Sequence, residues 1–558
     1  MPDDTLRDLA EEYWETLLEA SPSTATLLGD HRYDDRLEDL SAEAEQAFRG
    51  RWASLRERVE AVPREGLEAG DLVTFGLLSG ELDDALASID QRLIELQSDQ
   101  MTGYHIELLQ AVPVMAAPDE ASAQMLVERF RQVPRALEQA AERFLAGAGA
   151  GRTPAAVCVS RSANMVEGYL ASSLDDDPFV NVGAPEGFDR TELRRVVEEE
   201  VRPAYRRMAD TLKDRLLPVA RDDEHCGLSW LGDDGAQIYA TLVSHHTTLE
   251  LPPEDIHAIG TEEVTEKLPA EYAEVGGRLF GLTDPAKVLD RLRTDPALRY
   301  STGEEIMADA REAFLAAKAM MGEWFGRLPQ SDCAIEEVPA FLAADSPSAY
   351  YFPPAGDGSR GGTYYVNTHA PADKARYETA SIAFHEAIPG HHLQLAIATE
   401  LTDVPRFRRF SLANTAYVEG WGLYAERLAE DMGLYRNDME RIGMLAADSI
   451  RACRLVVDTG LHALGWTRQQ AVDFMAANTP VSVEEVTVEI DRYIGMPGQA
   501  LAYKLGQREI LRLRASAQEQ LGDRFDFRGF HDAVLTSGAV RLPILAELVG
   551  AWVDSVPH

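Results

Sequence analysis

One stretch constrains this chain more than any other: residues 381–394, which read S-I-A-F-H-E-A-I-P-G-H-H-L-Q. His385 is followed directly by Glu386, and two more histidines come a few residues later. In a helix, residues at i and i+4 lie on one face, so two histidines at that spacing can bind one metal ion. A Glu beside the first His can take a proton from a metal-bound water. The stretch is nearly a zinc-hydrolase helix, and Glu386 is its candidate catalytic base.

The spacing departs from that pattern at Pro389, which occupies the i+4 position and cannot bind a metal. Proline also lacks the N–H that would bond the carbonyl one turn back, and Gly390 allows backbone angles closed to other residues. The pair predicts that the helix opens for one turn and presents a later His. Peptidases with H-E-x-G-H or H-E-x-x-G-H motifs have Gly before the ligand His, which favours His391. Helix phase alone also allows His392, at i+7.

The run H-E-A-I-P-G-H-H-L-Q resembles the signature of a large bacterial family of unknown function, domain-of-unknown-function family number 885, in the zincin metallopeptidase clan. The chain is similar in outline to oligoendopeptidases, Taq-type carboxypeptidases and angiotensin-converting enzyme. The resemblance begins near S-P-S-T-A-T-L-L-G-D-H at 21–31 and is most specific from about 360 to 510. It implies a mainly α, large two-lobed fold with a deep cleft, a gluzincin-type site of two His and one Glu, and peptide hydrolysis.

A catalytic zinc needs a third protein ligand and one open position. Gluzincins take that ligand from a following helix, and A-Y-V-E-G-W-G-L-Y-A-E at 416–426 resembles the family's second motif. The resemblance assigns the role to Glu419, 28 residues after His391. Glu426, seven residues further on, either supports a ligand His or is a solvated charge. Glu378, seven residues before the first His of the motif, has the same two interpretations.

The segment S-I-R-A-C-R-L-V-V-D-T-G-L-H at 449–462 carries charged residues at helical spacing among Leu, Val and Ala. Such a helix has little reason to contain Arg451, Arg454, Asp458 and His462 unless that face meets a polar cleft. We expect Asp458 to orient His462 for transition-state stabilisation, and an Arg to bind a substrate carboxylate. The alternative is a buried ion-pair network between helices.

The segment D-R-Y-I-G-M-P-G-Q-A-L-A-Y-K-L-G at 491–506 resembles the family's third motif. Related peptidases use a Tyr hydroxyl to stabilise the oxyanion, so the resemblance makes Tyr493 and Tyr503 the candidates, without ranking them. Gln499 and Lys504 are candidate substrate contacts.

Short β-like runs at 333–339, 348–352 and 362–367 predict a small sheet just before the metal motif. In zincins the edge strand at this place pairs with extended substrate. Tyr364 is therefore a candidate substrate-binding residue of the cleft wall, and an ordinary structural hairpin is the alternative interpretation.

Apolar residues at three- and four-residue intervals predict helices through most of the rest of the chain. We expect an N-terminal helical lobe at 1–230 and a catalytic zincin-like lobe at 231–558, forming one intertwined unit. The run A-G-A-G-A-G at 146–151 predicts a flexible connector. Capping boxes at Thr302–Glu305 and Ser482–Glu485 predict two helix starts. The helices expected before the sheet lie at 3–20, 41–62, 70–98, 119–147, 154–172, 190–220, 235–250, 254–280 and 302–326.

The charge of the chain excludes some partners. The formal net charge is −41 over 558 residues, which argues against nucleic acid or an anionic membrane, because both require positive charge. The sequence has no apolar run of transmembrane length, and its start lacks the features of a signal peptide, so the cytoplasm is the expected location. The four scattered cysteines predict reduced thiols. A homodimer is compatible with the sequence.

Together these features predict a zinc-dependent hydrolase of short peptides, with one zinc ion bound by His385, His391 and Glu419. A carboxylate clamp at Arg451 or Arg454 would favour carboxypeptidase or dipeptidase action.

Two alternatives stay open at this point. One is a di-metal carboxylate protein in a helical bundle. Such a site would use Glu378, His385, Glu386, Glu419 and Glu426, but the sequence lacks the Glu-x-x-His pairs that such sites need. The other is a metal protein of the same fold that is non-catalytic or hydrolyses a non-peptide amide.

Overall fold

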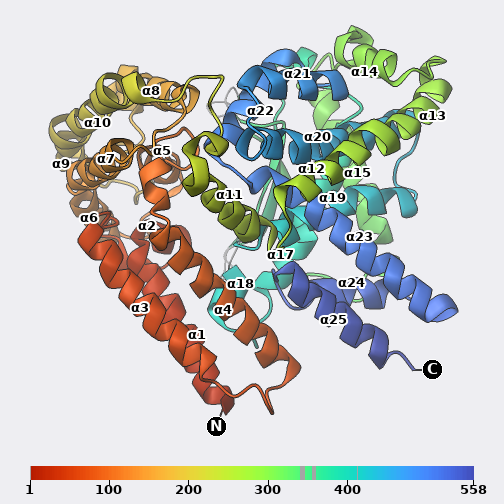
Figure 1. Cartoon of the computed structure of the whole chain (residues 1–558), viewed down its shortest axis with the longest axis horizontal. Helices are drawn as coiled ribbons and strands as arrows, with labels where there is room; N and C mark the ends of the chain where they lie inside the picture. The colour runs from red at the N-terminus through yellow and green to blue at the C-terminus, as the bar shows by residue number, and fades with distance from the viewer. Residues whose placement is uncertain (1, 340–342, 344–345, 355–359, 411–412, 558) are drawn as a thin grey trace.

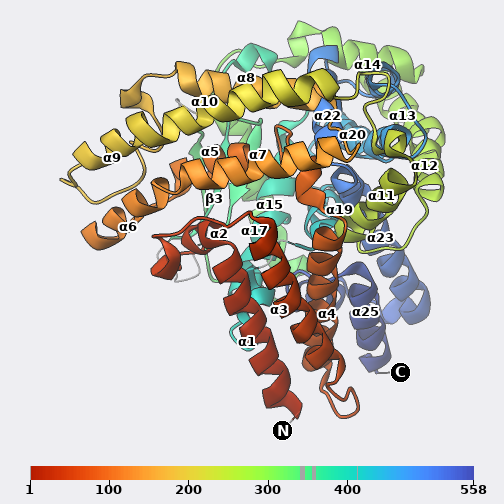
Figure 2. The same cartoon turned by 60° about the vertical axis from the view of Figure 1, so that its left-hand side comes forward.

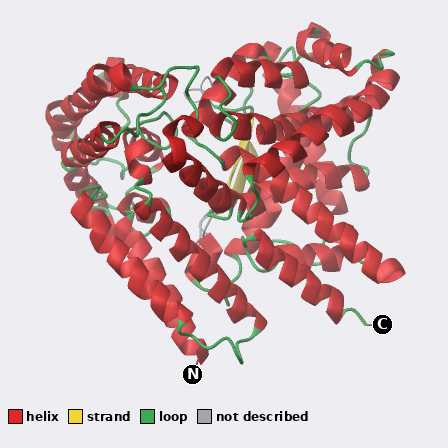
Figure 3. Ribbon diagram, viewed as in Figure 1, coloured by secondary structure: helices red, strands yellow, loops and turns green. Residues whose placement is uncertain are grey.

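The computed structural model describes residues 2–339, 343, 346–354, 360–410 and 413–557. The chain folds mainly into α-helices around one small three-stranded sheet, as predicted (Figure 1). Figure 3 shows the strands, in yellow, among the helices in the middle of the molecule. Among the described helices, none is both long and apolar enough to span a bilayer.

The elements of the first part of the chain, among its described residues, are all helices joined by loops and turns. In Figure 2, α6 to α10 lie above the upper ends of α1, α3 and α4. The predicted helix at 119–147 is two helices, α6 and α7, and the predicted connector at 146–151 is wrong, because its first four residues form the last turn of α7. The helices are α1 (Pro2–Ala20), α2 (Pro22–Leu27), α3 (Ala42–Glu60), α4 (Ala69–Asp90), α5 (Tyr104–Ala111), α6 (Glu120–Phe130), α7 (Val133–Gly149), α8 (Ala156–Ala171), α9 (Thr191–Val196) and α10 (Arg202–Asp210).

One hydrophobic core joins the beginning of the chain to its second half. Buried Leu6 and Leu78 belong to the same cluster as Phe384, Trp421 and Ile510. Burial of apolar side chains is the dominant favourable term in folding, so this shared core ties α1 and α4 to the helices that carry the metal motif.

The second part of the chain contains the sheet and the remaining helices. Both predicted capping boxes, Thr302–Glu305 and Ser482–Glu485, are confirmed and begin α15 and α22. The helices are α11 (Gly232–Thr247), α12 (Pro253–Glu262), α13 (Leu268–Phe280), α14 (Pro285–Thr294), α15 (Gly303–Trp324), α16 (Thr379–Glu386), α17 (His391–Thr399), α18 (Arg406–Phe410), α19 (Thr415–Asp431), α20 (Asp438–His462), α21 (Arg468–Asn478), α22 (Val483–Gly495), α23 (Ala502–Leu521), α24 (Phe527–Leu535) and α25 (Leu542–Ser555).

The sheet consists of β1 (Cys333–Glu337), β2 (Ala349–Phe352) and β3 (Gly362–Val366), and the three predicted strand positions are confirmed. Its spatial order is β1-β3-β2, with β1 parallel and β2 antiparallel to β3. Because β3 pairs on both sides, it is the central strand and β2 is an edge strand. The edge strand β2 contacts α16, the first helix of the metal motif.

Candidate metal centre

The metal motif spans two helices. The first, α16, ends at Glu386, and α17 begins at His391 after a turn at 387–390. A Cβ at position 390 would lie 1.8 Å from the carbonyl oxygen of His385, so only Gly fits between the two helices. The predicted opening at Pro389 and Gly390 is therefore confirmed as a complete break, and it lets the second helix approach the first at a new angle.

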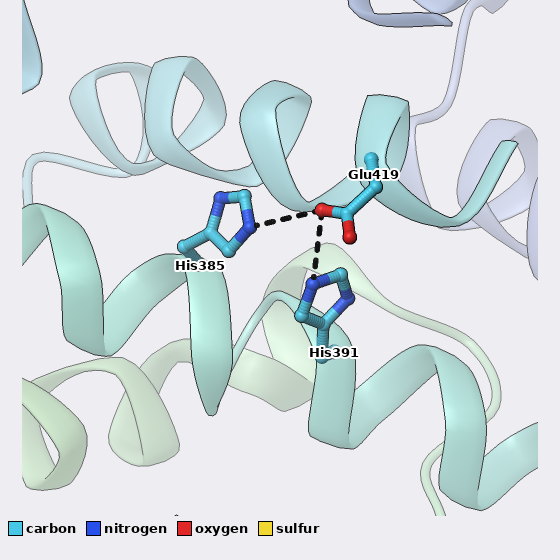
Figure 4. Close-up of side chains that lie close together, drawn as sticks. All are labelled: His385, His391 and Glu419. Carbon is cyan, nitrogen blue, oxygen red and sulfur yellow. Dashed lines mark ion pairs between the residues drawn. The ribbon is translucent and has the colours of Figure 1, made fainter. Parts of the chain in front are cut away.

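His385, His391 and Glu419 converge at this break (Figure 4). Nε2 of His385 and Nε2 of His391 each lie 3.5 Å from Oε2 of Glu419. The two imidazole rings are nearly perpendicular, with centroids 4.8 Å apart. Among the residues that the structure describes, this is the group of His, Cys, Asp and Glu side chains whose ligand atoms could surround one metal ion.

The two nitrogen–oxygen distances among these ligand atoms match those of a zinc site. Two atoms that each lie about 2.1 Å from a tetrahedral zinc are about 3.4 Å from each other. The two nitrogen–oxygen distances here are both 3.5 Å. Imidazole nitrogen and carboxylate oxygen are ligands that zinc accepts, and two neutral rings with one carboxylate suit a divalent cation. The donor set and its geometry thus fit the group that the motif implies.

His392 turns away from this cluster. Its Nδ1 lies 2.9 Å from the hydroxyl of Tyr351 on β2, and burial lowers the pKa of the imidazole to about 4. Of the two histidines that the sequence left open, His391 is the one that the fold brings beside Glu419.

Glu426 supports the first histidine. Its Oε1 lies 2.8 Å from Nδ1 of His385, and its Oε2 accepts a hydrogen bond of 2.6 Å from the hydroxyl of Ser381, one turn earlier on α16. A Cβ at Gly422 would lie 2.7 Å from the His385 ring, so this glycine lets the ring pack against α19. The carboxylate fixes the ring so that Nε2 faces Glu419, which is the usual arrangement behind a metal-binding His.

The charges of the cluster are strongly coupled. Burial opposes protonation of His385, but hydrogen bonds to Glu419 and Glu426 outweigh burial and raise its pKa to about 9. Burial raises the pKa of Glu419, but the contacts with His385 and His391 outweigh burial and hold this pKa well below its usual range. The site is therefore already arranged to hold positive charge between the two rings and the carboxylate.

Glu386 sits next to the cluster, at the end of α16. Its Oε2 accepts a hydrogen bond of 3.1 Å from the backbone N–H of Tyr351 on the edge strand β2. Burial raises the pKa of Glu386, while the positive charges of His385 and His391 act against that shift. A carboxylate whose pKa is raised toward neutrality is suited to accept and return a proton.

Tyr503 is brought to the site by the close approach of α19 and α23. A Cβ at Gly420 would lie 2.5 Å from the backbone of Gly506, so the two helices meet at a pair of glycines. Their contact places Tyr503, three residues before Gly506, near Glu419. Burial raises the pKa of the Tyr503 hydroxyl, and the charge of Glu419 adds to that shift. The hydroxyl therefore keeps its proton and can donate a hydrogen bond.

The other tyrosine candidate, Tyr493, has its hydroxyl engaged elsewhere. It donates to Glu489 and accepts a hydrogen bond of 2.8 Å from Nε of Arg454. Gln499 faces Tyr503, with 3.5 Å between its Nε2 and the Tyr503 hydroxyl, and it accepts a bond of 2.9 Å from Arg492. Of the two tyrosines, Tyr503 is the one whose hydroxyl is near enough to Glu419 for the charge of that carboxylate to act on it.

Two sequence predictions on α20 and α23 do not match the structure. The predicted pairing of Asp458 with His462 is wrong, because Asp458 bonds to Tyr239 on α11 and to the backbone of Gly498. His462 accepts a 3.1 Å bond from the N–H of Leu228, and its Nε2 lies 3.0 Å from the carbonyl oxygen of Tyr493. Both ring nitrogens are thus committed to the main chain, and burial lowers the pKa of His462 to about 4.

Lys504, a predicted substrate contact, is not available to bind substrate. It is 3% exposed and forms ion pairs with Asp448, at 2.5 Å, and Glu263, at 3.3 Å. It therefore belongs to a buried charge network between helices.

The expected edge strand is also corrected. Tyr364 lies on β3, the central strand, and is 1% exposed, so its backbone pairs with β1 and β2 and has no free edge for a peptide. The edge strand β2 reaches Glu386 of the metal motif through the backbone N–H of Tyr351. Sequence reasoning missed Tyr351, and the strand-like run at 348–352 was the signal that could have identified it.

Comparisons with known proteins place the chain in a wider group. The family described as "Bacterial protein of unknown function (DUF885)" matches residues 22–549. A crystal structure of a candidate lipoprotein from Colwellia psychrerythraea is similar over 99% of both chains, with 27% identity and a TM-score of 0.91. A candidate lipoprotein of unknown function from Shewanella oneidensis shares the fold, with 16% identity over 97% of this chain and 99% of its own, and a TM-score of 0.79. No curated protein matches the sequence.

Proposed function

The chain belongs to the DUF885 family of bacterial proteins of unknown function, and from its site geometry we propose that it is a zinc-dependent hydrolase of short peptides. The observation that carries the proposal is the convergence of His385, His391 and Glu419 beside Glu386. In this proposal the chain is a zincin-like peptidase of the gluzincin type. Helical lobes at 1–230 and 231–558 enclose a deep cleft that admits short peptides and excludes folded proteins.

His385, His391 and Glu419 would hold one zinc ion, and Glu426 would keep the ring of His385 in position. A zinc ion bound there would polarise a peptide carbonyl and lower the pKa of a bound water. Proton transfer and oxyanion stabilisation in the proposed reaction are assigned to side chains of the protein.

Glu386 is the proposed general base and acid. The N–H of Tyr351 orients the carboxylate through Oε2, and we assign proton transfer to Oε1. Glu386 takes one proton from the attacking water and passes it to the leaving amine, which is the usual double role of such a carboxylate. Burial raises the pKa of Glu386, which makes the carboxylate a better proton acceptor for this exchange.

Tyr503 is the proposed oxyanion donor. Its hydroxyl stays protonated because burial and the nearby charge of Glu419 raise its pKa. A neutral donor at this place stabilises the negative charge that develops on the carbonyl oxygen during attack. Tyr493 and His462 are left out of the proposed reaction, because their polar atoms are bonded to Glu489, Arg454 and the main chain.

The proposal is tested first by metal content, measured by elemental analysis on purified protein. We expect about one zinc per chain in the wild type, His392→Ala and Glu386→Gln, and loss of zinc in His391→Ala and Glu419→Ala. His392→Ala is the matched control, because it removes the adjacent imidazole. Zinc retained in both His391→Ala and Glu419→Ala would overturn the site.

The reaction is tested next with a library of short peptides. Zinc-loaded wild-type protein should release cleavage products, identified by mass spectrometry. Glu386→Gln, which keeps the ligands, should reduce the rate by several orders of magnitude. A wild-type protein that binds zinc but cleaves no peptide would refute the hydrolase and leave the metal site standing.

A further inference from the structure

Three arginines gather around Tyr503. Arg451 and Arg454 come from α20, and Arg492 comes from α22. The guanidinium carbon of Arg454 lies 4.5 Å from the centroid of the Tyr503 ring, and that of Arg451 lies 6.0 Å from it. Arg454 and Arg492 both bond to Glu489, at 3.1 Å each. This is a local concentration of positive charge in a chain whose net charge is −41.

Two of these arginines have donors to spare. Nη1 of Arg454 and Nε of Arg451 are buried and have no hydrogen-bond partner among the described residues. Arg454 is only 8% exposed as a whole residue. Buried donors on charged groups are nearly always satisfied in native proteins, because leaving them unpaired is costly. These two donors can therefore receive an acceptor that the described residues do not provide.

The spare donors border the candidate metal centre. Arg454 packs on the Tyr503 ring, and the charge of Glu419 acts on the hydroxyl of that side chain. The positive charge of Arg451 acts on Glu386 and on Glu378, which lie at the two ends of α16. Arg454 thus links the Tyr503 ring to Glu489 on α22, and the charge of Arg451 reaches both carboxylates of α16.

We propose that Arg451 and Arg454 bind a carboxylate of the substrate, so that this protein acts on peptides that carry a free carboxylate close to the cleaved bond. The proposal rests on the proposed function, because it defines the substrate of the same site. A planar guanidinium with free N–H groups matches a carboxylate in shape and charge, and it pairs with that group more strongly than with a neutral acceptor. The carboxylate can be the C-terminus of the peptide or the side chain of an acidic residue.

The position of the clamp sets the bond that is cut. Arg454 packs on the ring of Tyr503, and the charge of Glu419 acts on the hydroxyl of the same side chain. An extended peptide advances about 3.5 Å per residue, so only a short piece of substrate fits between the clamp and the metal centre. If the carboxylate is the C-terminus, the enzyme removes one or two residues from the end of a peptide.

The test measures binding, so that it does not depend on turnover. Zinc-loaded Glu386→Gln protein is titrated by calorimetry with three tetrapeptides: a free acid, the same peptide as a C-terminal amide, and an amide whose last residue is Glu. We expect the free acid to bind about 10- to 100-fold more tightly than the plain amide. If the amide that ends in Glu binds as tightly as the free acid, the arginines bind a side-chain carboxylate. If it binds as weakly as the plain amide, they bind the C-terminal carboxylate.

Three double variants show which arginine produces the preference for a carboxylate. In the Glu386→Gln background, Arg451→Gln and Arg454→Met should each bring the affinities for peptides with and without a carboxylate to within about threefold. Arg441→Gln is the matched control, because it removes one positive charge from α20 at its ion pairs with Glu274 and Glu430. Arg451→Gln carries the test alone if the substitution of buried Arg454 prevents folding, because the one bond that Arg451 donates within the described residues reaches Ala447 on its own helix.

Two results would overturn the clamp. One is equal affinity for all three peptides, and the other is a preference for the carboxylate that survives the substitutions at both arginines. Failure of the proposed function gives a different pattern: the wild type cleaves no peptide, while the Glu386→Gln protein still prefers the carboxylate and loses that preference in Arg451→Gln. That pattern would keep the clamp and make the protein a binder of peptides with a free carboxylate.

Discussion

Replacing Glu426 with Gln tests how the chain holds its first metal ligand. Glu426 is 2% exposed and bonds to both Nδ1 of His385 and the hydroxyl of Ser381. Glutamine has the same shape: its carbonyl oxygen can still accept from His385 and its amide can donate to Ser381. The substitution therefore removes the negative charge while keeping both hydrogen bonds, and a change in zinc affinity reports the charge alone.

The size of the effect follows from the bond that weakens. A hydrogen bond to an ionised acceptor is roughly twice as strong as a neutral one, which is a difference of about 1.4 kcal/mol, or tenfold in affinity. This agrees with the roughly 10- to 100-fold losses that follow when the carboxylate behind a metal-binding His is altered. We expect the zinc dissociation constant of Glu426→Gln to rise about tenfold.

The assay is a zinc competition titration against a chromophoric chelator, with thermal unfolding to verify the fold. Glu430→Gln is the matched control, because Glu430 lies one turn later on α19 and pairs with Arg441, at 2.6 Å, away from the metal ligands. A Glu426→Gln protein that is folded and binds zinc within twofold of the wild type would refute the argument that this carboxylate orients His385.

Three further predictions follow from the same contacts. Without zinc, the pKa of His385 is about 9 in the folded protein against 6.5 for a free His, which contributes roughly 3 kcal/mol to the free energy of unfolding. This contribution is complete below pH 6.5 and is lost as the pH rises through 9. Urea unfolding of chelator-treated protein at pH 6 and pH 9 measures the loss, and equal stabilities at the two pH values would contradict the prediction. Tyr503→Phe should lower kcat about 100-fold with KM little changed, since it removes the oxyanion donor; steady-state kinetics with an unchanged kcat would exclude that role. His462→Ala should cost about 3 kcal/mol of stability, because the N–H of Leu228 and the carbonyl of Tyr493 lose their partner, while zinc affinity stays unchanged; reduced zinc content in folded protein would show that the His does more than pack.

The parts of the fold that depend on local sequence were predictable. A capping box is read from residues three apart, and both predicted boxes begin helices. The break in the metal motif is also local, because Pro389 and Gly390 act on the turn that contains them. The metal ligands themselves came from the motif spacing and from the resemblance that it carries, and the structure brings those three side chains together.

The parts that depend on distant partners were not predictable. In the order β1-β3-β2, the strand that comes second in the sequence lies at the edge of the sheet. The sequence pattern of a strand indicates which side chains are buried, but it does not indicate which strands are its neighbours. The same holds for His462, whose partners are the backbone of Leu228, 234 residues away, and of Tyr493. Helical spacing placed His462 and Asp458 on one face, yet each found a different partner from another helix.

Glu426 and Glu378 show where a helical-spacing argument holds and where it fails. Each lies seven residues from a metal ligand, so spacing alone treats them alike. Glu426 and Glu419 are both inside α19, where a separation of seven residues keeps two side chains on nearly the same face, and Glu426 reaches His385. Glu378 stands at the N-cap position of α16 and makes no side-chain capping bond, and no hydrogen bond or ion pair among the described residues joins it to the three ligands. Burial and the charge of Glu485 raise the pKa of Glu378 to about 7. Glu426 supports a metal ligand because it shares α19 with Glu419 and because α19 packs on α16, the helix that carries His385.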